Sequence, residues 1–579
     1  MKRKTLPIIF ATGMVLGICA AACGAAGTVT NANDATDTSV IIESEDTEKT
    51  AENISNTETV STVNMSTDTT TIGAVTSVSE LDLEGMFTER DIDTGYDESN
   101  STIITLSDSS AEVTGEGVNA DGTTITITSE GTYIFSGELK EGQIIVDVDD
   151  SEKVQIVLNG VTITNDDSAC IYVKCADKVF VTLAQGTENS LSDSGSEYIQ
   201  EDSETNVDGV IYSKDDITFN GSGSLTINAS YANGIVGKDD VKFTGGTYNI
   251  TAVGNAIEGK DSVRINNGNF NLISGKDKDG IHTSNEEESG KGYVYIEGGD
   301  ITINAQDDGI HAATVLYICG GNIDVTESYE GLEGDTIEIL DGTIKVKSSD
   351  DGLNASTSTS QDESGFGQMG GGMDYDENAY IHICGGDIYV NADGDGIDSN
   401  GDIYIDGGYV VVDGPVNDGN GPLDKGGTAY ISGGTVIAVG SSGMVETFSS
   451  ESEQYSILYG FESSLEAGTE ITITDNDGNT CMGYTLNKTA SSVVFSSEDL
   501  AEGEYTITAG DFTDTITVSD KSTTAGASVG TMGGHGGAGL GQGRRMKNEM
   551  LEGQDMQNMQ GEKPEGQPPA EMQNQDGQN

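Results

Sequence analysis

Short runs of alternating apolar and polar residues fill the middle of the chain, and glycine, asparagine and aspartate separate the runs. Among them recurs a phrase of Asp or Asn, Gly, and Ile or Leu, as in Asp279-Gly280-Ile281. Its apolar residue, which we call the inward column, stands at Ile211, Ile235, Ile257, Ile281, Ile310, Leu332, Leu353 and Ile397. The steps are 24, 22, 24, 29, 22, 21 and 44 residues, and periods of this size indicate a solenoid.

The runs are rich in Ile, Val, Thr and Tyr, and no stretch shows an apolar stripe of helical period. We therefore predict an all-β protein built as a parallel β-helix, in which each strand pairs with its counterpart about 4.8 Å away in the next coil. A second column is predicted to supply left-handed corners, where a Cβ would be opposed. It consists of Gly223, Gly246, Gly268, Gly299, Gly321, Gly342, Gly386, Gly408 and Gly434.

Changes of composition divide the chain. The β-helix is predicted over residues 96–440, and 441–518 contain hairpin signals such as Asp477-Gly478, which predict a small antiparallel cap. Residues 24–95 are rich in Thr, Ser and Asp and predict a disordered stalk, while 519–579 are rich in Gly, Met and Gln and predict a disordered tail. The segment 356–378 reads as a loop inserted into one coil.

The chain carries 98 acidic and 26 basic residues, for a formal net charge of −72. A charge of this sign and size argues against nucleic acid as a partner.

The first residues combine a basic start, an apolar run and small residues before Cys23, which is the pattern of a bacterial lipoprotein signal over residues 1–23. It predicts an extracellular protein anchored to the cell membrane by a lipid on Cys23. If the lipid site is not used, the segment is an ordinary secretory signal and the protein is released. The five cysteines that follow show no metal-ligand spacing.

Three segments carry a resemblance: GTYIFSGELKEGQIIVDVDDSEKVQIVLNGVTI, the DGIH-type repeats, and GNGPLD with ISGGTVIAVGSSGM. Together they resemble a family of secreted bacterial carbohydrate-binding domains first defined in cellulolytic clostridia, over roughly residues 100 to 518. The resemblance implies a right-handed parallel β-helix, calcium sites at the turns, and binding to cellulose or polygalacturonate-like polymers. It supplies no catalytic residue.

Acidic residues recur beside the inward column. The outward column holds Tyr212, Val236, Glu258, His282, His311, Glu333, Asn354 and Asp398, and the turn column holds Asn233, Asn255, Asp279, Asp308, Glu330, Asp351, Asp395 and Asp418. Stacked carboxylates repel each other, and calcium, which accepts six to eight oxygen ligands, would remove that cost. The candidate metal ligands are Asp307, Asp308, Glu330, Glu333, Asp350, Asp351, Asp395, Asp398 and Asp418. The alternative is a charged turn that faces water.

Candidate sugar contacts are of two kinds. Tyr317, Tyr389 and Tyr404 offer rings for stacking, and the lysine column Lys214, Lys238 and Lys260 offers positive charge. The lysines are each followed by an aspartate, so a salt-bridged ladder on a solvated face is the simpler interpretation.

Three functions follow. The first is calcium-dependent polysaccharide binding at the cell surface without catalysis. The second is a calcium-dependent lyase or hydrolase of pectin-like polymers, for which His282 and His311 stand near several aspartates. The third is a structural or adhesion protein of the surface. No catalytic residue is assigned.

Overall fold

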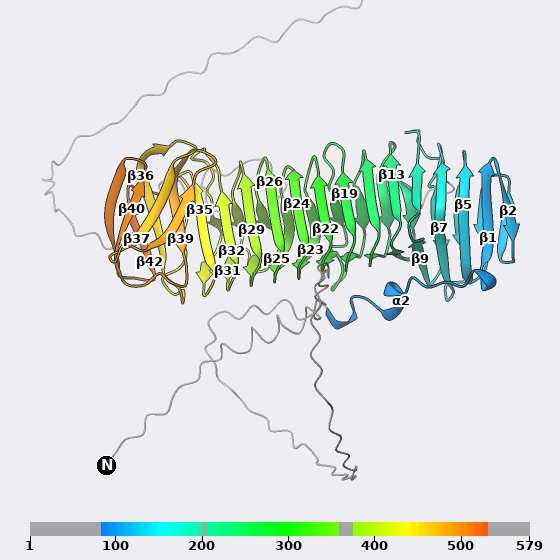
Figure 1. The fold of residues 1–579 in the computed structure, drawn as a ribbon, viewed down its shortest axis with the longest axis horizontal. Coiled ribbons are helices and arrows are strands. Elements are labelled where there is room, and N and C mark those ends of the chain that lie inside the picture. The colour runs from blue at the N-terminus through cyan, green and yellow to red at the C-terminus, as the bar shows by residue number, and fades with distance from the viewer. Residues whose placement is uncertain (1–82, 196, 201–204, 358–374, 531–579) are drawn as a thin grey trace, which may run out of the picture. The chain divides into compact units, whose positions relative to one another are not determined.

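A computed structural model describes residues 83–195, 197–200, 205–357 and 375–530. Almost all of its regular structure is β, and parallel strands repeat coil after coil to form a solenoid (Figure 1). Cys23 and most of the predicted inserted loop lie outside the described residues. Among the described helices, none is both long and apolar enough to cross a membrane.

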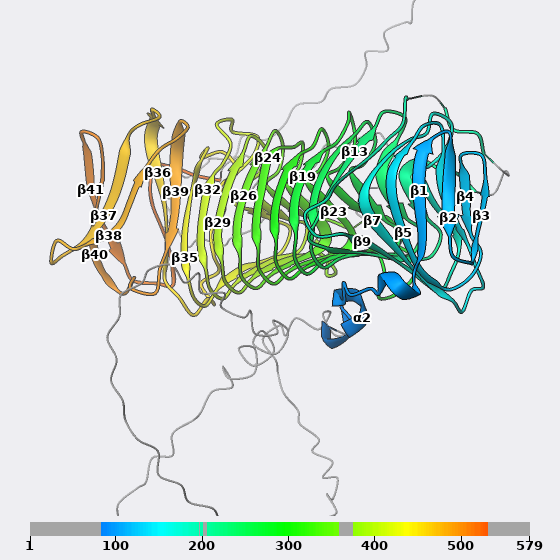
Figure 2. The same ribbon diagram turned by 45° about the vertical axis from the view of Figure 1, so that its right-hand side comes forward.

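Three columns of parallel strands make up the coils, and Figure 2 shows the strands stacked side by side. The first column is β6 (Gln143–Asp147), β8 (Ile171–Cys175), β11 (Gly209–Ser213), β14 (Asn233–Gly237), β17 (Ile257–Gly259), β20 (Ile281–Thr283), the starts of β23 (Ile310–Ile318) and β25 (Leu332–Ile339), β27 (Leu353–Ala355), β30 (Ile397–Ser399) and β33 (Asp424–Lys425).

The second column begins in β7 (Lys153–Thr164) and uses the ends of β23 and β25. Its other members are β9 (Lys178–Leu183), β12 (Asp216–Gly221), β15 (Asp240–Phe243), β18 (Ser262–Ile265), β21 (Tyr293–Ile296), β28 (Tyr380–Ile383), β31 (Asp402–Ile405) and β34 (Ala429–Ile431).

The third column continues from the end of β7. It consists of β10 (Glu188–Ser192), β13 (Ser224–Ala229), β16 (Thr247–Ala252), β19 (Asn269–Ile273), β22 (Asp300–Asn304), β24 (Asn322–Glu327), β26 (Thr343–Ser348), β29 (Asp387–Ala392), β32 (Tyr409–Asp413) and β35 (Thr435–Gly440).

The strand register confirms the inward column. Each member from Ile211 to Ile397 pairs with the next, and every one is at most 1% exposed. Together with inward side chains of the other two columns they form one core cluster. Burying such a side chain contributes about 1.5–3 kcal/mol, so the column accounts for the regular stacking.

The glycine column is confirmed at eight of its nine predicted positions, from Gly246 to Gly434, where φ lies between 78° and 141°. The exception is Gly223: in that coil Gly221 has the positive φ, of 101°. A Cβ on Gly221 would come within 2.2 Å of the Leu183 carbonyl oxygen, so this corner requires glycine.

Antiparallel pairs stand at both ends of the parallel stack. At the start β1 (Thr102–Asp108) pairs with β2 (Ser110–Thr114) and β3 (Val118–Asp121) with β4 (Thr124–Ile127), while β5 (Gly131–Leu139) joins β1 to β7. At the end β39 (Ala490–Ser496) pairs with β35 and β36 (Ser456–Leu465). A separate four-stranded sheet contains β37 (Glu470–Asp475), β38 (Thr480–Thr485), β40 (Gly503–Ala509) and β41 (Phe512–Val518).

The disorder predicted for the stalk and for the tail is wrong where each segment meets the folded part of the chain. Residues 83–95, expected in the stalk, contain η2 (Leu83–Gly85) and α2 (Glu89–Ile92) and pack on the second column; η3 (Glu98–Asn100) follows. The reason is that Met86 is buried against tyrosines and Asp91 against Lys178. Similarly β42 (Ser522–Gly526), expected in the tail, pairs with β36.

Candidate functional site

The outward column of the first strand column carries the candidate chemistry. Its predicted register is confirmed from Tyr212 through Glu258, His282, His311 and Glu333 to Asp398. The structure extends it by one coil, because Asp398 pairs with Asp424. Since the turn column lies beside it, carboxylates from two columns line one edge, which we call the acidic edge.

Side chains of the turn column make a ladder between coils. The side-chain oxygen of one coil accepts a hydrogen bond from the backbone N–H of the next, as Asp279 does from Asp308 at 3.0 Å and Asp351 does from Asp395 at 2.6 Å. Asn233 and Asn255 do the same. The ladder occupies one oxygen of each of these two aspartates, and the other oxygen of Asp279 lies 2.7 Å from His282 Nδ1.

Asp351, Asp395 and Asp398 form a crowded part of the acidic edge, with three carboxylate oxygens within 4.8 Å of one another. Asp398 is 7% exposed, and its Oδ1 has no hydrogen-bond partner among the described residues. Burial and the neighbouring carboxylates raise the pKa of Asp351 to about 6 and of Asp395 to about 8. They raise the pKa of Asp398 well above its usual range, because the charged forms of these three carboxyl groups find no compensating positive charge in the cluster.

A second cluster, of Asp279, Asp307, Asp308, His311 and Glu333, differs because histidine compensates its charge. His311 Nδ1 lies 3.3 Å from Asp308 and contacts Glu333, and the rings of His282 and His311 stack 4.9 Å apart. Burial opposes a charge on His311, but the bonds to Asp308 and Glu333 raise its pKa to about 11. This cluster therefore already holds a cation, whereas the cluster of Asp351, Asp395 and Asp398 holds none of its own.

Three other predicted metal ligands lie differently. Glu330 accepts a hydrogen bond of 2.7 Å from Asn354. Its burial and, second, the charge of Glu333 raise the pKa of Glu330 to about 8. Asp350 is half-buried beside the crowded cluster. The prediction that Asp418 belongs to the turn column is wrong, because its side chain is exposed. Gly421 takes that position, and its backbone N–H donates a hydrogen bond to Asp395. The turn before β33 is longer than the repeat interval of the sequence predicts.

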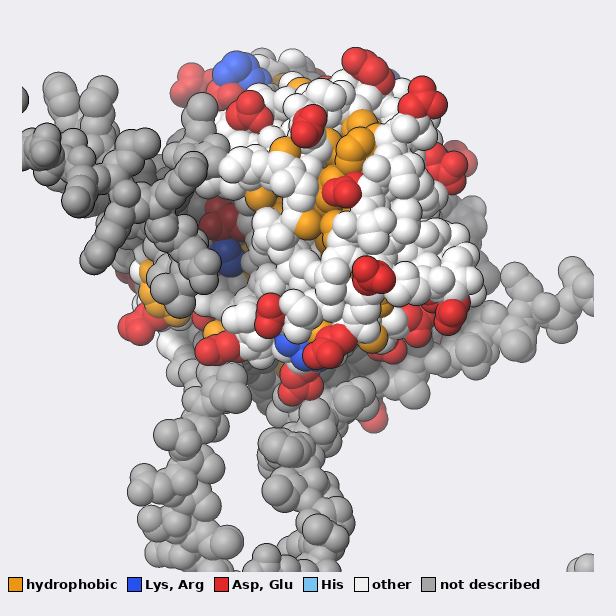
Figure 3. Space-filling model, turned by 90° about the vertical axis from the view of Figure 1, so that its left-hand side faces the viewer, with side chains coloured by type: hydrophobic (Ala, Val, Ile, Leu, Met, Phe, Trp, Pro, Cys, Tyr) orange, Lys and Arg blue, Asp and Glu red, His pale blue; other side chains and the backbone are white. Residues whose placement is uncertain are grey.

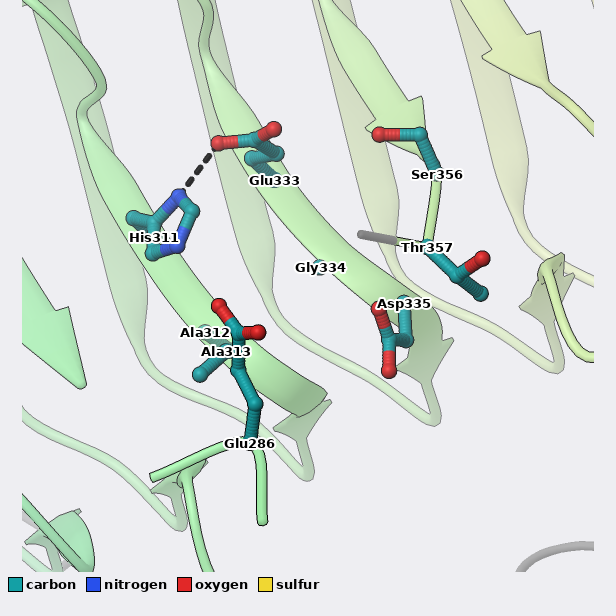
Figure 4. A pocket seen from close by; sticks show the side chains of 9 residues that line it. All are labelled: Glu286, His311, Ala312, Ala313, Glu333, Gly334, Asp335, Ser356 and Thr357. Carbon is teal, nitrogen blue, oxygen red and sulfur yellow. Dashed lines mark hydrogen bonds and ion pairs between the residues drawn. The ribbon is translucent and has the colours of Figure 1, made fainter. Parts of the chain in front are cut away.

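A pocket of about 140 Å³ opens next to His311 and Glu333 (Figure 4). Glu286 lies beside Ala312 and Ala313, while Asp335 and Thr357 come from the neighbouring coils. Burial and, second, the negative charge of Glu286 raise the pKa of Asp335 to about 7. The pocket thus places polar side chains around a space at the acidic edge.

The predicted tyrosines do not form one surface. Tyr317 is wrong as a sugar contact, because it is 3% exposed and packs with Met86 and Tyr295 beneath residues 83–87. Tyr389 is half-buried and donates a hydrogen bond of 2.6 Å to Asp413. Tyr404 is half-buried and stacks on Tyr430 at 5.6 Å. Only the last two remain able to meet a ligand.

The lysine column is only partly a salt-bridged ladder. Lys238 pairs with Glu258 at 3.3 Å, and its Nζ lies 5.5 Å from the centre of the Tyr212 ring. Lys214 lies 6.0 Å from the centre of the Tyr172 ring, and Lys260 is exposed. The three lysines lie towards the end of the outward column opposite to Asp398, and carboxylates such as Glu258 and Asp239 lie beside them.

Two residues of the acidic edge were missed from the sequence. Asp424 has no Asp-Gly-Ile phrase around it, so nothing local marks its register. Tyr329 is 47% exposed, and its backbone bridges Asp307 and Asp350, which places its ring beside the carboxylates. The signal for Tyr329 was its position directly before Glu330-Gly331 in the turn.

Acidic side chains are also spread over the end of the molecule formed by the C-terminal strands, where Figure 3 shows few lysines or arginines. Attraction of an acidic polymer by this surface is therefore unfavourable without a cation.

The chain is similar to proteins that are described as containing a carbohydrate-binding domain. A family model described as "Carbohydrate-binding domain-containing protein" matches residues 121–373. A protein of the same description from Acetivibrio thermocellus is 44% identical over 216 residues, which are 37% of this chain and 74% of the relative. A solved structure described as a polysaccharide lyase-like protein from C. thermocellum, in a gadolinium derivative, is 40% identical, with 38% of this chain and 90% of that chain covered and a TM-score of 0.37. From the similarity to its relative, the chain belongs to the family of carbohydrate-binding domain-containing proteins.

Proposed function

We propose that this protein binds an extracellular polysaccharide along its acidic edge, without cleaving it, and that calcium held at Asp351, Asp395 and Asp398 takes part in binding. The observation that carries the proposal is the buried Asp398: its Oδ1 has no hydrogen-bond partner among the described residues, and its carboxylate lies close to those of Asp351 and Asp395. The solenoid is proposed to be a right-handed parallel β-helix, which would present the edge as a straight, repeating surface.

Calcium suits this site because every side-chain donor is an oxygen. Calcium accepts six to eight oxygens in loose geometry, whereas magnesium requires a near-ideal octahedron. Asp424 stands one coil beyond Asp398 and is a further oxygen donor. Its burial and the neighbouring Glu446 raise the pKa of its carboxyl group. An ion here would also remove the repulsion among the buried carboxylates.

The charge of the polymer determines whether its binding requires calcium. A protein of net charge −72 repels a polygalacturonate-like chain, and a bound calcium ion that takes carboxylates from both partners would overcome the repulsion. A neutral glucan such as cellulose needs no bridge. It would rely on rings such as Tyr404 and on hydrogen bonds.

Affinity electrophoresis tests the proposal in gels that contain polygalacturonate or a soluble glucan, with calcium or with EDTA. We expect polygalacturonate to retard the protein only with calcium, and the combined change of Asp351, Asp395 and Asp398 to Asn to abolish that effect. Asp418→Asn is the control, because it makes the same substitution at an exposed aspartate outside the cluster. Retardation by polygalacturonate that survives EDTA would contradict calcium bridging and would favour Lys214, Lys238 and Lys260 as the contact.

One observation favours the enzymatic alternative. A carboxyl group with a pKa near 7, as at Asp335, can act as a general acid at neutral pH, and it lies in a pocket with His311 and Glu286. Lyase action would release unsaturated uronides that absorb ultraviolet light, and hydrolysis would release reducing ends. Release of either product by the wild type, and its loss in Asp335→Asn, would replace binding by catalysis as the function.

We further propose that the protein acts outside the cell, held by a lipid on Cys23. The support is the basic, then apolar, then small-residue order of residues 1–23. Metabolic labelling with an alkyne fatty acid should mark the wild type and leave Cys23→Ser unlabelled. An unlabelled wild type found in the medium would instead indicate a secreted protein.

A further inference from the structure

A second group of metal-ligand side chains lies on the second strand column, away from the acidic edge. Outward side chains of this column stack as Tyr317, Glu338, His382, Tyr404 and Tyr430 in successive coils. Cys384 follows His382 by two residues, at the end of β28. One donor atom each from Glu338, His382 and Cys384 lies within 4.8 Å of the other two.

The three donor atoms stand close to the spacing of a coordination sphere. His382 Nδ1 lies 2.9 Å from Glu338 Oε2 and 3.9 Å from Cys384 Sγ, which is 3.4 Å from Nε2 of the same ring. Zinc holds nitrogen, oxygen and sulfur at about 2.0–2.3 Å in a tetrahedron, so its ligand atoms stand about 3.3–3.6 Å apart. An ion between the three donors would therefore require Glu338 to move away from His382 and the thiol of Cys384 to turn towards Nδ1.

The other ring nitrogen of His382 is already fixed. Nε2 lies 3.1 Å from Asp406 Oδ2, and Ser432 donates a hydrogen bond of 2.5 Å to Asp406 Oδ1. A carboxylate that accepts the N–H of a histidine sets its tautomer and leaves the opposite nitrogen as the ligand. Asp406 would therefore orient the ring and direct Nδ1 towards Glu338.

Glu338 supplies an independent sign of a missing partner. The residue is 3% exposed, and its Oε1 has no hydrogen-bond partner among the described residues. A buried carboxylate oxygen without a partner is costly, because that oxygen loses its hydration and gains no hydrogen bond in compensation. A bound cation would provide that compensation.

We propose that Glu338, His382 and Cys384 form a zinc site, with Asp406 as the residue that orients His382. The ligand chemistry selects the metal, because thiolate and imidazole suit zinc, whereas calcium prefers oxygen. Three protein ligands leave a fourth position for water or another donor. The ion would join the coil of Glu338 to the next coil, which carries His382 and Cys384, on the side of the solenoid that residues 83–95 partly cover.

Cobalt is the probe, because a thiolate bound to cobalt gives charge-transfer absorption in the near ultraviolet. The titration uses the purified chain with a reductant and excess calcium, so that sites built from oxygen alone are filled. We expect the band in the wild type, its removal by one equivalent of zinc, and its loss in Cys384→Ser. Cys481→Ser is the matched control, because Cys481 is also half-buried and lies on β38, outside the cluster.

Alkylation of the wild type by iodoacetamide, followed by mass spectrometry, decides the question if Cys384→Ser does not fold. Zinc is expected to slow modification of Cys384 at least tenfold and to leave Cys481 unchanged. Absence of the cobalt band in the wild type, persistence of the band in Cys384→Ser, or equal alkylation with and without zinc would overturn the proposal. His382 would then be only an ion-pair partner of Glu338 and Asp406.

Discussion

The carboxylate of Asp91 lies 2.7 Å from Nζ of Lys178, and both side chains are buried although Asp91 belongs to a segment outside the coils. Thr218 donates a second hydrogen bond of 2.7 Å to the same oxygen. A capping box between Thr88 and Asp91 holds the short helix α2 in place. This pair therefore fastens residues 83–95 to the second strand column.

Asp91→Ala should release that segment. Removing one partner of a buried ion pair leaves the other charge uncompensated, which costs about 3–5 kcal/mol. Since the segment lies outside the coils, we expect faster proteolysis around residues 83–95 and greater exposure of Tyr317, rather than global unfolding. Asp93→Ala is the control, because its pair with Arg90 is exposed and contributes little. Equal protection of both variants would show that Met86 alone holds the segment.

Asp398→Asn should have opposite effects with and without calcium. In EDTA it removes a carboxyl group whose ionisation is opposed by burial and by neighbouring carboxylates, so we expect the free energy of unfolding to rise, on the order of 1 kcal/mol. In calcium it removes a ligand, so the added stability conferred by the ion should fall. Chemical denaturation in both buffers measures the two effects, and Asp418→Asn should change neither. A loss of stability in EDTA would mean that Asp398 is held by an interaction that its geometry does not reveal.

Stability without calcium should fall as pH rises from about 4 to about 8. Burial, followed by contacts with other carboxylates, raises the pKa of Asp395 and of Glu330 to about 8, whereas carboxyls of the unfolded chain titrate near 4. Between these values the folded protein binds more protons than the unfolded one, so each rise in pH favours unfolding. The depressed pKa of Asp91 acts only below this window, where acid removes the stability of its ion pair.

Denaturation in EDTA at pH 5.5 and pH 8 tests this dependence. We expect a loss on the order of 2 kcal/mol between the two values, and calcium should reverse it most at the higher pH. The combined change of Asp351, Asp395 and Asp398 to Asn should reduce the dependence, and Glu330 should account for part of what remains. An unchanged slope in that variant would attribute the effect to Glu330 and to other groups outside the cluster.

The periodic part of the fold could be predicted from the sequence, because one residue type repeated at one interval fixes the strand register. Ile310 and Glu333 therefore lie in the columns expected of them. The prediction failed where the interval changed. The turn before β33 made Asp418 look equivalent to Asp395, although the residue in the equivalent position is Gly421. Periodicity carries no information about a coil of altered length.

Contacts that join distant segments could not be predicted either. Tyr317 resembles an exposed strand residue until Met86, more than two hundred residues earlier, covers it. The group of Glu338, His382 and Cys384 has no recognisable spacing, because the inserted segment around residues 358–374 separates Glu338 from the strand that pairs with it. Such sites follow from stacking and become visible only in three dimensions.

Tyr329→Ala should weaken polysaccharide binding while leaving calcium stabilisation intact. Its ring is 47% exposed beside Asp350, whose hydrogen bond and charge raise the pKa of Tyr329 to about 12, so the phenol stays neutral and can stack on a sugar. Tyr409→Ala is the matched control, since Tyr409 is also 47% exposed but lies on β32, in the third strand column. Loss of a stacking contact worth about 1 kcal/mol would weaken binding roughly fivefold, which affinity electrophoresis can resolve. Equal weakening by both changes would mean that the polymer does not follow the acidic edge, and the binding face would then have to be sought on the third strand column.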